Sequence, residues 1–206
     1  MKKAIVIYCS FTGNTEKVAR SVAAGLERGG CAVELMTVKE AETVSFDDYD
    51  LVCFGVPSIN WQPPKPAQEY LNKKFAQYKE KYGPVPPCAP SRALARPPRR
   101  PAPHPHTPPP TRPGKNALLF CTWSGPHTGM REAEPCLLVI GQYFEHFGFT
   151  VLDKWYILSE FKGSVPNSTL GRMGDIRGLP SLEDLRRVET QAENIVARLQ
   201  PAQTAE

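Results

Sequence analysis

No long hydrophobic run occurs in the 206-residue sequence, and this absence excludes one broad class of protein. No stretch approaches the roughly 20 apolar residues that a membrane-spanning helix needs, so we expect no insertion into a membrane. The apolar run after Met1-Lys2-Lys3 stops at Ser10, short of the roughly 7–15 residues of an export segment. We therefore expect a cytoplasmic protein.

Closely paired cysteines are also missing. The six cysteines stand singly, without a Cys-x-x-Cys pair, at Cys9, Cys31, Cys53, Cys88, Cys121 and Cys136. Iron–sulfur and zinc sites need clustered thiolates, so we expect no metal centre. Four of the six lie in or beside apolar, strand-like runs, where a thiol acts as a small hydrophobic side chain.

Acidic residues are absent from residues 84–114, which hold 13 of the chain's 22 prolines and five of its arginines. Without those arginines the chain has 20 basic and 21 acidic residues, so the formal charge of +4 belongs to this segment. A nearly neutral remainder is not a nucleic-acid-binding signature, and we expect no nucleic-acid partner. Because the segment lacks backbone donors and apolar side chains, we expect an exposed, disordered insertion. Recognition of its Pro/Arg pattern by a polyproline-binding domain is a minor alternative.

Outside that insertion, short apolar runs alternate with helical patterns. The first run is rich in β-branched residues, which is typical of a strand buried on both faces. Val18, Ala19, Val22 and Leu26 recur at the spacing of a helix face. Predicted strands cover residues 3–9, 32–38, 51–55, 117–121 and 150–157, and predicted helices cover residues 15–28, 66–82, 132–147 and 181–199. Ser181 and Asp184 resemble a capping box at the start of the last helix.

This alternation predicts an α/β fold with a five-stranded parallel sheet covered on both faces and joined by right-handed crossovers. We expect a single domain over residues 1–200, interrupted by the insertion at residues 84–114 and followed by a flexible tail at residues 201–206. Ligands of such sheets lie beyond the carboxyl ends of the strands. The candidate binding loops therefore follow Cys9, Gly55 and Cys121.

The first loop reads Ser10-Phe11-Thr12-Gly13-Asn14-Thr15 and opens a predicted helix. Successive backbone N–H groups and the helix dipole can form an anion site there without Lys or Arg. The Gly-Lys-Ser/Thr of a nucleoside-triphosphate loop and the Gly-x-Gly-x-x-Gly of a dinucleotide fold are both missing. The loop therefore suits a single terminal phosphomonoester, while the alternative is a polar turn that only caps the helix.

Ser-x-Thr-Gly-Asn-Thr at the end of a first strand resembles the phosphate-binding loop of the flavodoxin family, and the resemblance covers residues 1–83 and 115–160. It implies a flavodoxin-like three-layer sandwich with flavin mononucleotide (FMN) as cofactor. It also implies that the FMN phosphate receives side-chain hydrogen bonds from Ser10, Thr12, Asn14 and Thr15 and backbone N–H groups from Phe11 to Thr15, including Gly13.

The second loop follows the third predicted strand and reads Gly55-Val56-Pro57-Ser58-Ile59-Asn60-Trp61. The resemblance places here the flavin loop whose apolar or aromatic side chain lies on one face of the flavin ring. Counted without gaps, that position falls near Ile59, while Trp61 lies two residues later, so both remain open. Asn60 stands where the family often has glycine, and Asn tolerates left-handed backbone geometry. The residues assigned to the cofactor are Pro57, Ser58, Ile59, Asn60 and Trp61.

The third loop, residues 122–129, follows the fourth predicted strand and carries an aromatic residue between small polar residues and glycines. By resemblance its backbone N–H groups bind the pyrimidine edge of the flavin, and Trp123 covers a face or rim of the ring. His127 is an exposed loop residue or a hydrogen-bonding and proton-donating group near the ring. The residues assigned to the cofactor are Thr122, Trp123, Ser124, Gly125 and Gly129.

The link at residues 159–180 is longer than a strand-to-helix connection requires. It contains four glycines together with Arg172, Asp175 and Arg177. A lid, a dimer arm, a nucleotide contact and a plain surface excursion all fit this composition.

Two redox functions follow from the resemblance, and no catalytic residue is assigned. The first is electron transfer through bound FMN to redox partner proteins, with the protein setting the flavin's potentials. The alternative is an FMN-dependent NAD(P)H:quinone or related reductase, with NAD(P)H or a quinone as small-molecule partner. The near-neutral core and the long link favour the reductase, whereas bulky Trp61 and Trp123 over the ring favour the carrier. A non-redox interaction module is a third possibility, and the oligomeric state stays open.

Overall fold

The computed structural model describes residues 1–83 and 111–199, and its centre is a five-stranded sheet in which every neighbouring pair is parallel. The strands are β1 (Lys3–Tyr8), β2 (Ala32–Thr37), β3 (Leu51–Pro57), β4 (Asn116–Trp123) and β5 (Thr150–Leu158), in the spatial order β2-β1-β3-β4-β5. The predicted α/β fold with a five-stranded parallel sheet is therefore confirmed.

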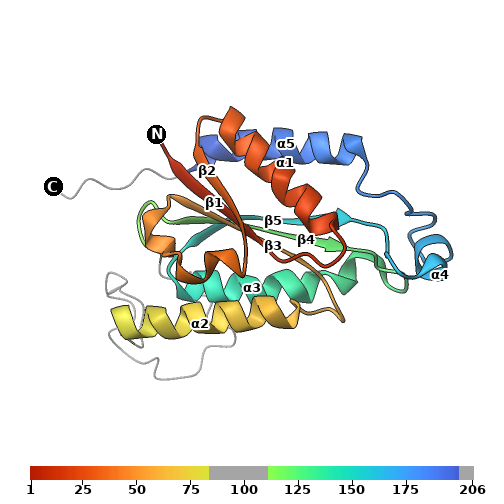
Figure 1. Ribbon diagram of the computed structural model, residues 1–206, viewed down its shortest axis with the longest axis horizontal. Coiled ribbons are helices and arrows are strands. Elements are labelled where there is room, and N and C mark those ends of the chain that lie inside the picture. Colours follow the sequence, from red (N-terminus) through yellow and green to blue (C-terminus); the bar gives the residue numbers. More distant parts are fainter. Residues whose placement is uncertain (84–110, 200–206) are drawn as a thin grey trace, which may run out of the picture.

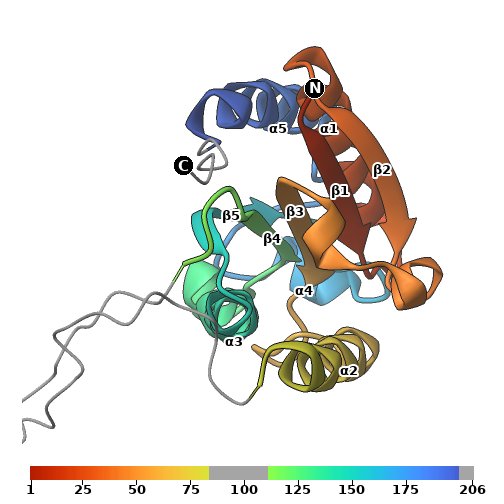
Figure 2. The same cartoon turned by 90° about the vertical axis from the view of Figure 1, so that its left-hand side faces the viewer.

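Helices cover both faces of the sheet, which makes three layers (Figures 1 and 2). On one face lie α1 (Asn14–Arg28) and α5 (Leu182–Ile195), and on the other lie α2 (Lys65–Tyr82) and α3 (Glu134–His146). Each face has its own core of buried side chains: aromatic rings dominate the α2/α3 side, and small aliphatic side chains of α1 fill the other. Burial on both faces explains why the central strands read as continuous apolar runs.

The strand order reverses direction between β1 and β3, which lie side by side although β2 comes between them in sequence. At such a switch point the connections leave toward opposite faces and open a crevice beyond the carboxyl ends of the strands. The short helix α4 (Val165–Thr169) lies at that end of the sheet, past the arrowheads of β4 and β5 (Figure 1). The topology therefore brings the first, second and third loops to one edge.

Two strands extend further than the sequence predicted. β3 continues to Pro57 and β4 to Trp123, because Pro57 pairs with Thr122 and Trp123 pairs with Leu158 of β5. Pro57, Thr122 and Trp123 thus belong to strands and not to flexible loops. The capping box at Ser181 and Asp184 is present as predicted.

Residues 84–110 of the predicted insertion lie outside the described residues. The predicted tail at residues 201–206 also lies outside them, together with residue 200. Residues 111–114 are described and lead into β4. Of the described chain, no helix has the length and apolar character needed to cross a membrane. The five cysteines within residues 1–83 and 111–199 are free and buried, as expected of thiols that pack like small hydrophobic groups.

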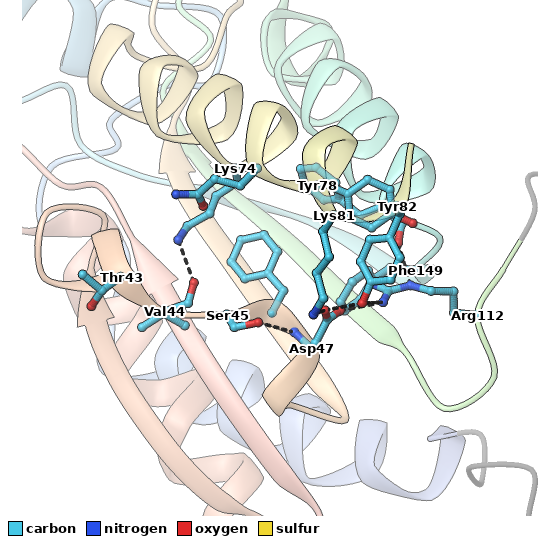
Figure 3. Close-up of a pocket in the computed structure, with 13 residues that line it drawn as sticks. Thr43, Val44, Ser45, Asp47, Lys74, Tyr78, Lys81, Tyr82, Arg112 and Phe149 are labelled. Carbon is cyan, nitrogen blue, oxygen red and sulfur yellow. Dashed lines mark hydrogen bonds and ion pairs between the residues drawn. The ribbon is translucent and has the colours of Figure 1, made fainter. Parts of the chain in front are cut away.

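An ion-pair cluster ties three segments together at the amino ends of the strands, opposite the loop edge (Figure 3). Asp47, which precedes β3, accepts hydrogen bonds from Lys81 and Tyr82 at the end of α2. Its other oxygen lies 2.6 Å from Arg112, and the side chains of Arg112 and Asp47 are only 14% and 21% exposed. Burial alone raises the pKa of Asp47, but the hydrogen bonds from Lys81, Tyr82 and Arg112 outweigh it and hold the pKa well below its usual range.

Aromatic rings enclose the Arg112 guanidinium. Its central carbon lies 5.4, 5.3 and 5.2 Å from the ring centroids of Tyr78, Tyr82 and Phe149. A guanidinium over aromatic faces gains cation–π attraction while keeping its hydrogen bonds. Arg112, the last arginine of the Pro/Arg-rich stretch, is therefore part of the folded structure.

We predict that Asp47→Asn lowers the free energy of unfolding at pH 7 by about 2 kcal/mol, because it leaves the largely buried Arg112 guanidinium without its counter-charge. The folded-state pKa is depressed, so this contribution is present above the unfolded value of about 3.9 and is lost as the pH falls through the folded pKa. Urea denaturation of parent and variant should therefore give a constant difference at neutral pH that shrinks below about pH 4.

Asp153→Asn is the matched control, because Asp153 pairs with Arg198 through side chains that are 44% and 52% exposed. Exposed pairs contribute about 0–1 kcal/mol, so this variant should resemble the parent. An Asp47→Asn protein as stable as the parent at pH 7, or a difference that persists unchanged in acid, would contradict the account.

Candidate functional site

Two adjoining cavities lie at the carboxyl edge of the sheet. One, of about 150 Å³, reaches the first loop, and the other, of about 420 Å³, lies between the second and third loops. They share the wall residues Ser58, Ile59, Trp123, Ser124 and Phe161. We call them the first-loop cavity and the ring cavity, and together they form one elongated site.

The structure brings most of the predicted cofactor residues to this site. Those that line a cavity are Phe11, Thr12, Asn14, Thr15, Pro57, Ser58, Ile59, Asn60, Trp61, Thr122, Trp123, Ser124 and Gly125. The other three, Ser10, Gly13 and Gly129, line neither cavity and make hydrogen bonds within their loops. Ser10 Oγ accepts a hydrogen bond of 3.1 Å from the Gly13 N–H, and the Gly129 N–H donates to the Gly125 carbonyl.

The first loop turns into α1 through Gly13, whose φ of 87° lies in the left-handed region. No side chain caps α1 at this residue, unlike α5, which has a full capping box. A Cβ placed on Gly13 would have nothing within 4 Å, so the start of the helix opens onto free space. Uncapped N–H groups at an open helix N-terminus are the donors that an anion needs.

Asn14 and Thr15 are buried, and their side chains connect the first loop to Glu160 and Thr122. The hydroxyls of Thr15 and Thr122 lie 2.7 Å apart, which joins the first loop to the third. One of them accepts, so its own hydrogen is still available to donate. The amide of Asn14 donates to the Glu160 carbonyl over 3.0 Å, while Asn14 Oδ1 has no partner among the described residues. A buried acceptor left open on a cavity wall fits a ligand hydroxyl.

The second loop ends in a tight turn in which Ile59 and Gln62 exchange backbone hydrogen bonds of 3.0 Å. Its two central residues, Asn60 and Trp61, have φ values of 47° and 65°. Left-handed geometry is expected at Asn60, but at a tryptophan it costs about 1–2 kcal/mol. Trp61 and Ile59 are 59% and 41% exposed, and both face the ring cavity.

The third loop is held by a glycine and a carboxylate. A Cβ on Gly125 would lie 2.5 Å from the Gly129 carbonyl oxygen and 2.6 Å from the Trp123 ring, so only glycine fits there. Glu132 Oε1 accepts the backbone N–H groups of His127 and Thr128 over 2.8 and 2.6 Å. This carboxylate fixes the loop and leaves the His127 ring on the wall of the ring cavity.

Trp123 is more buried than its predicted place on the flavin ring suggests. Only 7% of it is exposed, because it continues β4 and packs into the α2/α3 core. Its indole N–H has no partner among the described residues, although the ring borders both cavities.

Sequence analysis left the role of the long link open and assigned none of its residues to the cofactor; its first residues, 159–163, form a fourth loop of this site. The Ser159 N–H donates to the Trp123 carbonyl, and Ser124 Oγ donates to the Ser159 carbonyl over 2.9 Å. Phe161 borders both cavities, and Lys162 borders the first-loop cavity. The unusual length of the link was the available signal, since Glu-Phe-Lys forms no motif.

Thiol chemistry does not arise from the cysteine next to the first loop. Cys9 is buried just after β1, and burial raises the pKa of its thiol, which disfavours the reactive thiolate. In the described parts of the chain, no three His, Cys, Asp or Glu residues are grouped so that they could hold a metal ion.

Comparison with known proteins agrees with this geometry. The flavodoxin family model matches residues 6–100. No curated protein sequence matches the chain.

Solved structures extend the likeness to the whole chain at low sequence identity. Oxidised flavodoxin 1 from Bacillus cereus is 13% identical with a TM-score of 0.60, covering 96% of this chain and 99% of that one. A flavodoxin from the domain Archaea is 16% identical with a TM-score of 0.56, covering 95% and 99%. A WrbA-like flavodoxin from Agrobacterium tumefaciens is 14% identical with a TM-score of 0.54, covering 97% and 100%. The chain therefore resembles the flavodoxin family in sequence over residues 6–100 and has a flavodoxin-like fold.

Proposed function

We propose that this protein binds FMN in the elongated site and transfers electrons through it to redox partner proteins. One observation carries the proposal: an uncapped helix N-terminus opens into a cavity that runs from the first loop to between the second and third. The flavodoxin family model implies a flavin cofactor, typically FMN. When bound, FMN supplies reversible one- and two-electron chemistry.

The first loop is the proposed phosphate end of the site. Its backbone N–H groups at the start of α1 and the exposed hydroxyl of Thr12 would donate to the phosphate oxygens, helped by the helix dipole. Ser10 has its oxygen occupied by the Gly13 N–H, so its own hydrogen is free to donate. Asn14 Oδ1, which faces no donor in the described chain, would accept from a ribityl hydroxyl.

The ring cavity is the proposed flavin end. The second and third loops would enclose the ring between them, with Trp61 on one face and the backbone N–H groups of residues 122–125 at its polar edge. The left-handed backbone at Trp61 supports this assignment over Ile59, because strained backbone conformations cluster at ligand-binding sites. These residues would tune the flavin by stacking, desolvation and hydrogen bonding.

A reductase that takes a hydride from NAD(P)H and passes it to a quinone is the second candidate. The ring cavity favours it, because its volume of about 420 Å³ and the exposed His127 on its wall leave room for a second planar ligand.

We predict that a carrier, unlike a reductase, does not accept a hydride from a nicotinamide nucleotide. Anaerobic stopped-flow mixing of the FMN-loaded protein with NADH or NADPH should leave the flavin absorbance unchanged on the seconds timescale. Rapid bleaching of the flavin by either nucleotide would contradict the carrier function and support the reductase.

We predict that Thr12→Val weakens FMN binding by about 10- to 150-fold, since a charge-assisted hydrogen bond is worth roughly 1.5–3 kcal/mol. Valine keeps the shape and removes the donor. Riboflavin, which has no phosphate, should bind parent and variant almost equally. Titrating apoprotein with each flavin and following the flavin fluorescence measures both constants.

Thr190→Val is the control, because Thr190 is exposed on α5 and its hydroxyl bonds only its own helix at Arg186. It should change neither constant. If Thr12→Val weakened the binding of both flavins equally, Thr12 would have a structural role only. If its FMN affinity were unchanged, the proposed phosphate site would be wrong.

We predict the opposite pattern for Trp61→Ala, which should weaken FMN and riboflavin by the same factor, about tenfold or more, because both carry the ring that the indole would cover. Trp61→Phe should keep most of the affinity, and Ile59→Ala should have the smaller effect. A large loss in Ile59→Ala with none in Trp61→Ala would instead make Ile59 the ring contact.

A further inference from the structure

We propose that Lys162, carried by the fourth loop, is a phosphate-binding residue of the flavin site and the determinant of its preference for phosphorylated flavin over riboflavin. This inference rests on the proposed function. It adds a cation to a phosphate site whose own loop, residues 10–15, contains none.

The ammonium of Lys162 is placed at the mouth of the first loop. Its Nζ donates to the Thr12 carbonyl over 2.9 Å, across 150 residues of sequence. Lys162 also lines the first-loop cavity together with Thr12, Asn14 and Thr15. One hydrogen bond uses one of the three ammonium donors, so two remain for a ligand.

The fourth loop is held in place by hydrogen bonds of the two residues that precede Lys162. The Glu160 carbonyl accepts the Asn14 amide, and both atoms belong to residues of the same cavity wall. The hydroxyl of buried Ser168 accepts the Phe161 N–H and donates to the Phe161 carbonyl, each over 3.1 Å. The Glu160 N–H donates to the Leu179 carbonyl over 3.0 Å. The long link is thus folded onto itself and against the first loop.

Lys162 has no carboxylate partner within 4.0 Å in the described chain, and the nearby acids are engaged elsewhere. Glu160 accepts the Gly178 N–H over 3.2 Å. Glu16, in the first turn of α1, pairs with Arg20 at 2.7 Å. An uncompensated cation beside an uncapped helix N-terminus gives a positive end to a cavity that is otherwise lined by neutral side chains and Glu160. That arrangement favours a dianion more strongly than the helix dipole alone, which equals about half a charge.

A tether that merely closes the loop is the competing explanation for the contact with Thr12. A tether would stabilise the site for every flavin alike, whereas a phosphate ligand acts only on flavins that carry the phosphate. The two explanations therefore differ in the ratio of two binding constants and not in either constant alone.

The test measures FMN and riboflavin affinities of the full-length apoprotein by flavin fluorescence. Lys162→Met keeps the length of the side chain and removes its charge, so FMN binding should weaken about tenfold while riboflavin binding changes by less than about twofold. Lys162→Arg should restore most of the preference. Raising the ionic strength should reduce the FMN preference of the parent more than that of Lys162→Met, because the charge interaction is screened.

Lys79→Met is the matched control, since Lys79 is exposed on α2 and lies over Phe75, at the end of the molecule away from the loops. It should leave both constants as in the parent. Equal weakening of both flavins by Lys162→Met, or no change in either, would overturn the assignment of Lys162. A parent protein that binds neither flavin, or binds riboflavin as tightly as FMN, would overturn the proposed phosphate site itself, so the two failures are distinguishable.

Discussion

The left-handed turn at Gly13 is the constraint on which the candidate site depends. Because this residue adopts a φ of 87°, the chain leaves β1 and enters α1 without a side-chain cap, and the space beside the Gly13 Cα is open. A Cβ would strain this geometry, so a residue other than glycine would redirect the helix entrance. The other loops are arranged around this point: the third through Thr122 and the fourth through Glu160 and Lys162.

The two ends of the sheet perform different tasks. At the amino ends of the strands, Asp47 and Arg112 lock α2 and the entry to β4 together through paired charges and aromatic rings. At the carboxyl ends, polar atoms such as Asn14 Oδ1 and the Trp123 indole N–H are left without partners in the described chain. Asn116 Oδ1, at the amino end of β4, also lacks a partner in the described chain, so such atoms are not confined to the loop edge. The two that belong to cavity-lining residues are available to a ligand there. The amino ends of the strands are thus closed by the Asp47–Arg112 cluster, whereas the cavities lie at the carboxyl ends.

The sequence predicted the features that depend on local pattern. The alternation of apolar runs and helical stripes led to the correct sheet, and the ends of the predicted strands led to the three loops that the fold brings to one edge, because both signals are contiguous in the chain. The strand ends at Pro57 and Trp123 were missed, since they depend on the pairing of β4 with β3 and β5, which no single segment encodes. The packing of Arg112 was missed for a related reason: its composition resembles the preceding Pro/Arg stretch, and only the fold brings Asp47 to it.

Contacts between distant segments also explain what was missed in the site itself. The pairing of Thr15 with Thr122 and the approach of Lys162 to Thr12 join residues more than 100 positions apart. The left-handed backbone at Trp61 was not foreseen either, because tryptophan rarely adopts it and nothing in its neighbours requires it. Such features appear only when the loops are assembled at one edge.

The identity of the flavin that the purified protein carries tests the central claim most directly. The protein should be yellow, and denaturation followed by chromatography should release FMN, because the first loop is suited to one terminal phosphate. Release of FAD or riboflavin, or a colourless protein whose apo form fails to bind FMN at micromolar concentrations, would contradict the account.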